Sequence, residues 1–206
     1  MEYNRNMVDM MCNGSQESYD TLINMFAHRR SELKNIDMFI DELTHRADSG
    51  NAIAQAFVAT LYLNGYGVPV NLSKALSYAR RSAGLGQPSG EVVLGIMYLY
   101  GYEISADPSR ALYWFKMASE KEYASAYNFL GYMYERGIGV RANAKEAFNY
   151  YQKSARNKNL VGLYNLGCCY EAGIGTKQNL AEAIRLYELA APNYPRAQNA
   201  LKKFKQ

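Results

Sequence analysis

The sequence is poor in the side chains that build redox and metal centres: its 206 residues include three cysteines and two histidines. Cys12 stands alone, and a bridge between the adjacent Cys168 and Cys169 would be strained, so we expect no disulfide framework. Neither His28 nor His45 stands with a cysteine, or with the other histidine, at zinc-ligand spacing. We therefore expect no metal site and no cofactor.

Motifs for phosphate binding and nucleophilic catalysis are also missing. The sequence contains no Walker-type loop, and its turns GYGV, GIGV and GIGT are weak evidence for phosphate binding. Cys168 has no nearby histidine or basic group to activate its thiol, so we expect an inert small residue there. With no catalytic residue assigned, the sequence predicts a protein that is not an enzyme.

Long apolar runs and a strong charge excess are absent as well. No stretch approaches the ~18 consecutive apolar residues of a membrane span, and the polar first 20 residues lack the apolar segment of a secretory signal. We therefore expect a cytoplasmic protein with no membrane insertion. The net charge of +4 is too small to indicate a nucleic-acid partner. With 49% apolar and 20% charged residues, the chain is neither disordered nor collagen-like.

The sequence does contain an internal repeat of 36 residues. Segments 51–86, 87–122, 123–158 and 159–194 align without gaps. Chance does not plausibly produce five shared columns at one spacing. The columns are Tyr62, Tyr98, Tyr134 and Tyr170; Gly65, Gly101, Gly137 and Gly173; Ala75, Ala111, Ala147 and Ala183; Asn71, Asp107, Asn143 and Asn179; and Ala59 with Gly95, Gly131 and Gly167.

The chemistry of these columns predicts two helices in every repeat. The third repeat places apolar residues at helical spacing before Gly137, and a glycine suits the left-handed residue that follows a helix. Asn143 is a preferred N-cap for a second helix, and Glu146 three residues later predicts a capping box, as does Glu182 in the fourth repeat. The predicted fold is all-α: an α-solenoid of helix–turn–helix repeats.

Small and aromatic columns predict how the paired helices pack. We expect Gly131 and Ala147 to face each other, so that the two backbones approach closely. The tyrosine column, together with Trp114, is expected to fill the core beside them and not to bind a ligand.

The segment LGYMYERGIGVRANAKEAFNYYQKSA resembles a Sel1-like repeat, a relative of the tetratricopeptide repeat, and the resemblance extends over residues 51–194. Two departures have expected consequences. Glu103 replaces the second loop glycine found at the equivalent positions of the other repeats, which predicts an irregular turn. Val58 and Ala59 replace the Leu-Gly pair of the first repeat, which predicts slightly wider helix spacing there. The chain lacks the paired cysteines of the cysteine-rich, extracellular members of this family.

The flanks are predicted to be caps, because a solenoid must cover its terminal repeat surfaces. Residues 1–15 are expected to be a mobile tail. Residues 16–50 are interpreted as a degenerate N-terminal unit with helices near 17–28 and 35–47, and residues 195–206 as a C-terminal capping helix.

The resemblance implies a recognition function, because stacked helix pairs present a concave face that holds a peptide or protein. Tetratricopeptide geometry assigns that face to exposed positions of each first helix, apolar in the second repeat and polar-aromatic later. The assigned residues are Thr60 and Leu63; Val92, Val93, Ile96 and Leu99; Asn128, Phe129, Tyr132 and Glu135; and Tyr164, Asn165, Cys168 and Glu171.

An alternative interpretation is that these residues are ordinary surface or packing between repeats. The sequence leaves the oligomeric state open, with a monomer favoured. The resemblance implies an adaptor for another protein, of the kind found in bacteria. It leaves open an immunity protein that neutralises a cognate toxin, or a secreted effector that contacts a host.

Overall fold

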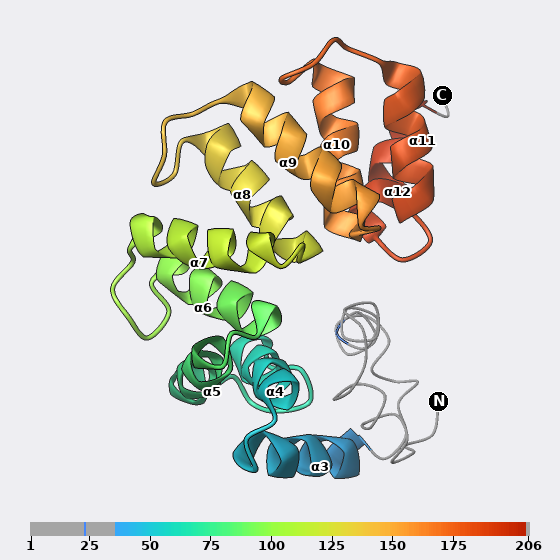
Figure 1. Cartoon of the computed structure of the whole chain (residues 1–206). Helices are drawn as coiled ribbons and strands as arrows, with labels where there is room; N and C mark the ends of the chain where they lie inside the picture. The colour runs from blue at the N-terminus through green and yellow to red at the C-terminus, as the bar shows by residue number, and fades with distance from the viewer. Residues whose placement is uncertain (1–22, 24–35, 205–206) are drawn as a thin grey trace. The chain divides into compact units, whose positions relative to one another are not determined.

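The computed structural model describes residue 23 and residues 36–204, and its regular elements are all helices that pack in sequential antiparallel pairs (Figure 1). The contacts divide the chain into two units, residues 1–114 and 115–206, and each is described by itself. In order, the helices are α3 (Ile36–Asp48), α4 (Ala52–Asn64), α5 (Leu72–Gly84), α6 (Pro88–Tyr100), α7 (Pro108–Glu120), α8 (Ala124–Arg136), α9 (Ala144–Arg156), α10 (Leu160–Ala172), α11 (Leu180–Ala190), α12 (Pro195–Leu201) and the 3-10 turn η2 (Lys202–Phe204).

The predicted glycine column ends the first helix of every repeat. The four glycines that follow α4, α6, α8 and α10 have φ between 68° and 72°, in the left-handed region that favours glycine. The predicted N-caps are also present. The Asn143 carboxamide accepts bonds from the Lys145 and Glu146 amides, and Asn71 and Asn179 cap α5 and α11 in the same way.

The two predicted capping boxes take a different form. The backbone N–H of Asn143 donates to the carbonyl of Tyr134 at 2.9 Å, instead of to Glu146. The same bond, of 2.8–2.9 Å, joins the N-cap to the tyrosine column in all four repeats, and Glu182 pairs with Arg185 instead. The tyrosine carbonyl thus replaces the glutamate as the acceptor, and it ties the end of each first helix to the start of the second.

The prediction of an irregular turn in the second repeat is wrong. Glu103 adopts φ 60°, close to the 67–80° of Gly67, Gly139 and Gly175 at the equivalent positions. The turn keeps the shape of its counterparts, because a non-glycine residue can occupy the left-handed region at a cost of about 1 kcal/mol.

The first unit has two adjoining cores. Phe39 of α3 and Phe57 of α4 meet edge to face with ring centroids 6.3 Å apart. The second core joins α4, α5 and α6 through small residues such as Ala79 and larger ones such as Leu94 and Met97. The column residues Tyr62 and Tyr98, and Trp114, are half-buried and pack against these cores, as predicted.

The core of the second unit is built around two buried tyrosines of the second helices. Tyr151 and Tyr187 are almost fully buried. A Cβ added at Gly131 would lie 2.6 Å from the Tyr151 ring, and one at Gly167 would lie 2.5 Å from the Tyr187 ring. The absence of a side chain at Gly131 therefore makes room for the ring of Tyr151, one turn along α9 from Ala147, and the contact between Gly131 and Ala147 stays a prediction.

The ends of the chain are described in part. Helix α3 corresponds to the helix predicted over 35–47, and α12 with η2 to the helix predicted after residue 194. The expected tail 1–15 and the expected helix 17–28 lie outside the described residues, apart from residue 23. No helix in the described part of the chain is long and apolar enough to cross a membrane.

Candidate partner-binding site

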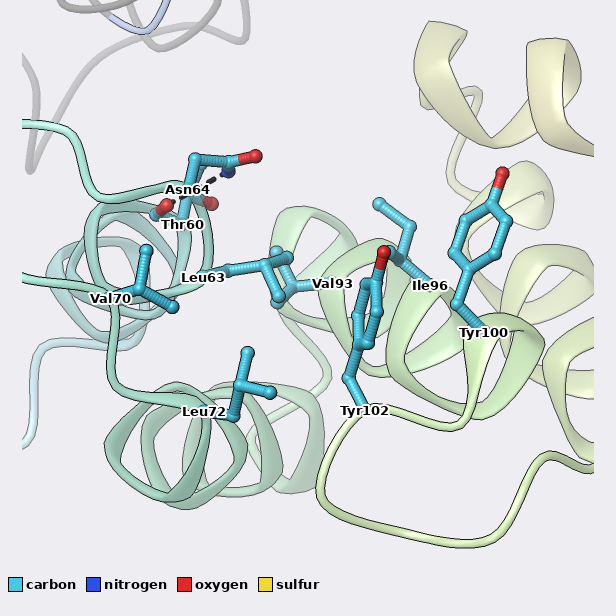
Figure 2. A pocket seen from close by; sticks show the side chains of 9 residues that line it. All are labelled: Thr60, Leu63, Asn64, Val70, Leu72, Val93, Ile96, Tyr100 and Tyr102. Carbon is cyan, nitrogen blue, oxygen red and sulfur yellow. Dashed lines mark hydrogen bonds between the residues drawn. The ribbon is translucent and has the colours of Figure 1, made fainter.

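A pocket of about 460 Å³ opens in the first unit between α4, α5, α6 and the loops that follow α4 and α6. Figure 2 shows side chains from these elements turned toward one space, with Leu72 reaching from α5 and Tyr102 from the α6–α7 loop. The lining residues are Thr60, Leu63, Asn64, Val70, Leu72, Val93, Ile96, Tyr100 and Tyr102.

Helical periodicity explains two walls of this pocket. Thr60, Leu63 and Asn64 are spaced by three and four residues, so they share one face of α4. Val93 and Ile96 are related in the same way on α6, and Tyr100 lies one turn further along. The remaining wall comes from the two loops and the first residue of α5, which no helical pattern groups together.

The lining is uncharged. Its polar groups are side-chain hydroxyls and one carboxamide. The Thr60 hydroxyl donates to the Ala56 carbonyl at 3.0 Å. The Asn64 amide donates to the Thr60 carbonyl at 2.9 Å, as Figure 2 shows. Both bonds orient the side chains along α4, and both donors bond to backbone carbonyls of the same helix.

The rim of the pocket leaves apolar surface in water. Val70 is 60% exposed, Tyr100 50% and Tyr102 38%. The two tyrosine rings stack with centroids 5.6 Å apart, so they form a preassembled aromatic wall. Exposed apolar side chains gathered around one pocket favour a contact with another molecule.

The structure brings four of the fourteen predicted face residues into this pocket: Thr60, Leu63, Val93 and Ile96. The expected exposed apolar surface on the second repeat is wrong at three positions, because the side chains of Val92, Val93 and Leu99 are 5%, 4% and 9% exposed. Val93 belongs to the core that joins α4, α5 and α6, which explains its burial. Partner binding by all fourteen residues stays a prediction.

The predicted residues of the second unit are half-buried, and several of them contact one another or the core. Asn165 donates to Asn128 at 2.8 Å, and Phe129 stacks on Phe115 with centroids 4.7 Å apart. Glu135 accepts a bond of 2.7 Å from the Tyr151 hydroxyl. The half-buried residues of this set are Asn128, Phe129, Tyr132, Glu135, Tyr164, Asn165, Cys168 and Glu171.

The charged members of this set are tied to the packed tyrosines. The Tyr187 hydroxyl donates to Glu171 at 2.6 Å, and Lys203 lies 3.2 Å from the same carboxylate. The Tyr187 bond, with help from Lys203, lowers the pKa of Glu171 against the opposing effect of burial. Burial, and then the bond to Glu135, raises the pKa of Tyr151. These groups serve the packing of the second unit.

The thiol of Cys169, which follows Cys168 in α10, is not activated as a nucleophile. Burial, followed by the charge of Glu135, raises the pKa of Cys169 to about 12, so the thiol stays protonated at neutral pH and is a poor nucleophile. Among the described residues, no three potential metal ligands come together.

Sequence reasoning missed five lining residues: Asn64, Val70, Leu72, Tyr100 and Tyr102. The assignment of the face considered a few positions of each first helix, so loop residues were outside its scope. Two signals were available in the sequence: the tyrosines on either side of Gly101, and the departure at Glu103 immediately after them.

Comparison with known proteins identifies the repeats. The sequence matches the Sel1 repeat at residues 52–87, 88–123, 124–159 and 160–191, which together make up more than half of the chain. A comparison with curated proteins finds no match.

Several solved structures are similar. A protective antigen of uropathogenic Escherichia coli strains, which has an SLR fold, is 29% identical with a TM-score of 0.65 over 79% of this chain and 35% of the antigen. A Sel1 repeat protein from Oxalobacter formigenes is 30% identical with a TM-score of 0.58 over 69% of this chain and 57% of that protein. The present chain therefore spans less than two thirds of the length of either.

A third similar structure supports the fold alone. A protein from Klebsiella pneumoniae, described as a Sel1 repeat protein, is 16% identical with a TM-score of 0.62 over 98% of both chains. At this low identity the likeness concerns the arrangement of helices.

Proposed function

Because the chain belongs to the Sel1 repeat family, whose repeats mediate protein interactions, we propose that it is a non-enzymatic adaptor that binds a segment of a partner protein in the pocket between α4, α5 and α6. The observation that carries this proposal is the exposed apolar rim of the pocket, above all Val70 and the stacked pair Tyr100 and Tyr102.

The energetics of the rim support a binding role. Full burial of one large apolar side chain stabilises by about 1.5–3 kcal/mol. Covering the three partly exposed rim residues would therefore contribute on the order of 3 kcal/mol, before any bond to the partner backbone. Binding would bury this surface without unfolding or rearranging the cores, since the rim residues lie at the ends of helices and in loops.

The test compares two aliphatic residues of equal exposure. Val70 is 60% exposed at the pocket, and Leu85 is 62% exposed after the end of α5, outside the pocket lining. A partner is captured with the wild-type chain, identified and purified. Its affinity is then measured by calorimetry for the wild type, for Val70→Asp and for Leu85→Asp.

We expect Val70→Asp to weaken binding at least tenfold, because the new carboxylate would be desolvated in an uncharged pocket. Leu85→Asp should bind within twofold of the wild type. Equal affinities for all three proteins would place the partner elsewhere on the chain and overturn the proposal.

A further inference from the structure

The pocket lies beside the one position where this array departs from its own loop pattern. The second loop position holds Gly67, Gly139 and Gly175 in three repeats and Glu103 in the second. Glu103 keeps the left-handed conformation of the glycines, with φ 60°. The left-handed conformation is strained for a glutamate and not for a glycine, so a role of the glutamate side chain would have to offset this cost.

The fourth repeat shows what a glycine at this position permits. A Cβ added at Gly175 would overlap the backbone carbonyl of Ala144 and would lie 2.9 Å from the Cβ of Phe148. The α10–α11 loop therefore lies directly on the first turn of α9. No side chain fits between that loop and that helix.

The same approach is impossible in the second repeat. Two repeat spacings relate Gly175 to Glu103, and two also relate Ala144 to Leu72, so Glu103 is placed next to α5 as Gly175 is next to α9. The Cβ of Glu103 prevents the α6–α7 loop from packing on α5 as closely as the α10–α11 loop packs on α9. The Glu103 carboxylate instead accepts a hydrogen bond of 2.5 Å from the Ser73 hydroxyl, in the first turn of α5. A side-chain bond thus takes the place of a backbone contact.

Two residues beside this altered loop–helix contact line the pocket. Leu72, the counterpart of Ala144, lines it from α5, and Tyr102, the residue before Glu103, lines it from the loop (Figure 2).

We propose that this pocket takes one large, uncharged side chain, aromatic or branched aliphatic, from the partner polypeptide, and that Glu103 is the positioning residue that keeps it open. This inference rests on the proposed function and adds the class of ligand. The absence of charge in the lining excludes a charged side chain, because moving an ion into this site without a counter-charge costs several kcal/mol. The volume of about 460 Å³ lies within the ~300–1,000 Å³ of ligand pockets.

The ligand class is tested with indole as the probe. The methyl groups of Leu63, Leu72 and Ile96 report on three walls of the pocket, and their shifts are followed by NMR of the methyl-labelled full chain. We expect saturable shifts with indole and at least tenfold weaker binding of indole-3-carboxylate. Equal binding of both probes, or no response to indole up to its solubility limit, would overturn the assignment of an uncharged side chain.

The role of Glu103 is tested with variants in the same titration. We expect Glu103→Gly to bind indole at least fivefold more weakly, because the loop can then settle on α5. Glu103→Ala keeps the Cβ and should stay within threefold of the wild type. Glu122→Gly relieves a similar conformation (φ 57°) in the second unit and should not change binding.

The outcomes separate this inference from the proposed function. Binding of indole by Glu103→Gly as tight as by the wild type would overturn the positioning role and leave the pocket in place. If Val70→Asp no longer binds the purified partner but the wild type does not bind indole, the ligand class would be overturned and the adaptor function would stand.

Discussion

At the scale of single residues, three positions among the described residues carry backbone strain that glycine would relieve. Glu103, Glu122 and Lys158 have φ of 57–60°, where an L-residue places its Cβ too close to a carbonyl oxygen. Glu103 has an evident use at the pocket. Glu122 and Lys158 stand in the column that begins with Gly50 and Gly86, both of which also have positive φ. These two residues thus follow the turn geometry without the residue type that suits it best.

We expect Lys158→Gly to raise the free energy of unfolding by about 0.5–1 kcal/mol. The relief of the left-handed conformation, worth roughly 1–2 kcal/mol, is partly offset by the larger chain entropy of glycine when unfolded. Urea denaturation followed by circular dichroism measures the change. The reverse substitution, Gly86→Lys, should lower stability by a similar amount, and a Lys158→Gly variant no more stable than the wild type would contradict the account.

At the scale of helices, paired positions rather than single columns set the packing. Where the second helix presents Tyr151, the first helix has Gly131; where the second helix has Ala79, the equivalent position of the first helix is Ala59. The interface between one repeat and the next shows the same exchange. Ser154 contacts Gly162 across it, whereas Ala118 and Ala126 occupy these positions one repeat earlier.

The serine side chain explains the second exchange. The Ser154 hydroxyl is buried and donates to the Ala124 carbonyl at 2.8 Å, and a Cβ at Gly162 would overlap the serine side chain. Ser82, with a bond of 2.6 Å to the Ala52 carbonyl, and Gly90 repeat this arrangement in the first unit. The hydroxyl therefore occupies the space that a methyl group fills in the Ala118–Ala126 combination.

We expect Gly162→Ala alone to destabilise the protein by about 1–3 kcal/mol through overpacking. Ser154→Ala alone should cost about 1 kcal/mol through the lost hydrogen bond. The double variant recreates the alanine pair and should be more stable than the sum of the two losses predicts, by at least ~0.5 kcal/mol. A double-mutant cycle by urea denaturation measures the coupling, and strictly additive losses would refute the pairing.

The helices could be predicted from the sequence because their signals are local. Glycine ends and Asn or Asp caps act within one turn, and both fell where the columns placed them, with Gly137 and Asn143 as examples. The contacts between two paired helices depend on residues that are far apart in the sequence, so local signals do not predict them. The register of the repeat aligned Gly131 with Ala147 as small residues, but only packing shows that the ring of Tyr151 fills the space beside the glycine.

The pocket was predictable on one side only. Thr60, Leu63, Val93 and Ile96 follow helical spacing, so the assignment of the first-helix face included them. Tyr102 lies in a loop, and Val92 and Leu99 became buried for reasons that spacing does not reveal. At Glu103 the residue type departs from the repeat while the backbone conformation does not, so the departure in sequence does not by itself show that a pocket lies beside it.

At the scale of the molecule, the titrating groups predict opposite effects of acid and alkali. The carboxylates of Glu171 and Glu182 have lowered pKa values, through the Tyr187 hydroxyl and Arg185 respectively. Burial raises the pKa of Tyr78 from 10.0, and that of Cys169 from 9.0, to about 12. The carboxylates both lie in the second unit, whereas the groups with raised pKa values occur in both units.

The signs follow from linkage. A carboxylate with a lowered pKa stabilises the fold above its unfolded pKa, about 4.3, and this stability is lost as the pH falls through the folded value. A thiol or phenol with a raised pKa stabilises the fold below its unfolded pKa, and this stability is lost as the pH rises from about 9 toward 12. The urea midpoint should therefore be highest between about pH 5 and 9 and should fall on both sides.

The contribution of Glu171 to the acid side of this profile can be tested through one hydrogen bond. Tyr187→Phe removes the hydroxyl that is the largest cause of the lowered pKa of Glu171. At pH 7 the variant should be about 1 kcal/mol less stable than the wild type. The difference should shrink below pH 4, because a protonated Glu171 no longer offers the wild type a carboxylate acceptor. Urea denaturation from pH 3 to 7 gives both profiles, and a constant difference across that range would show that the bond does not discriminate between the charged and the neutral carboxyl group.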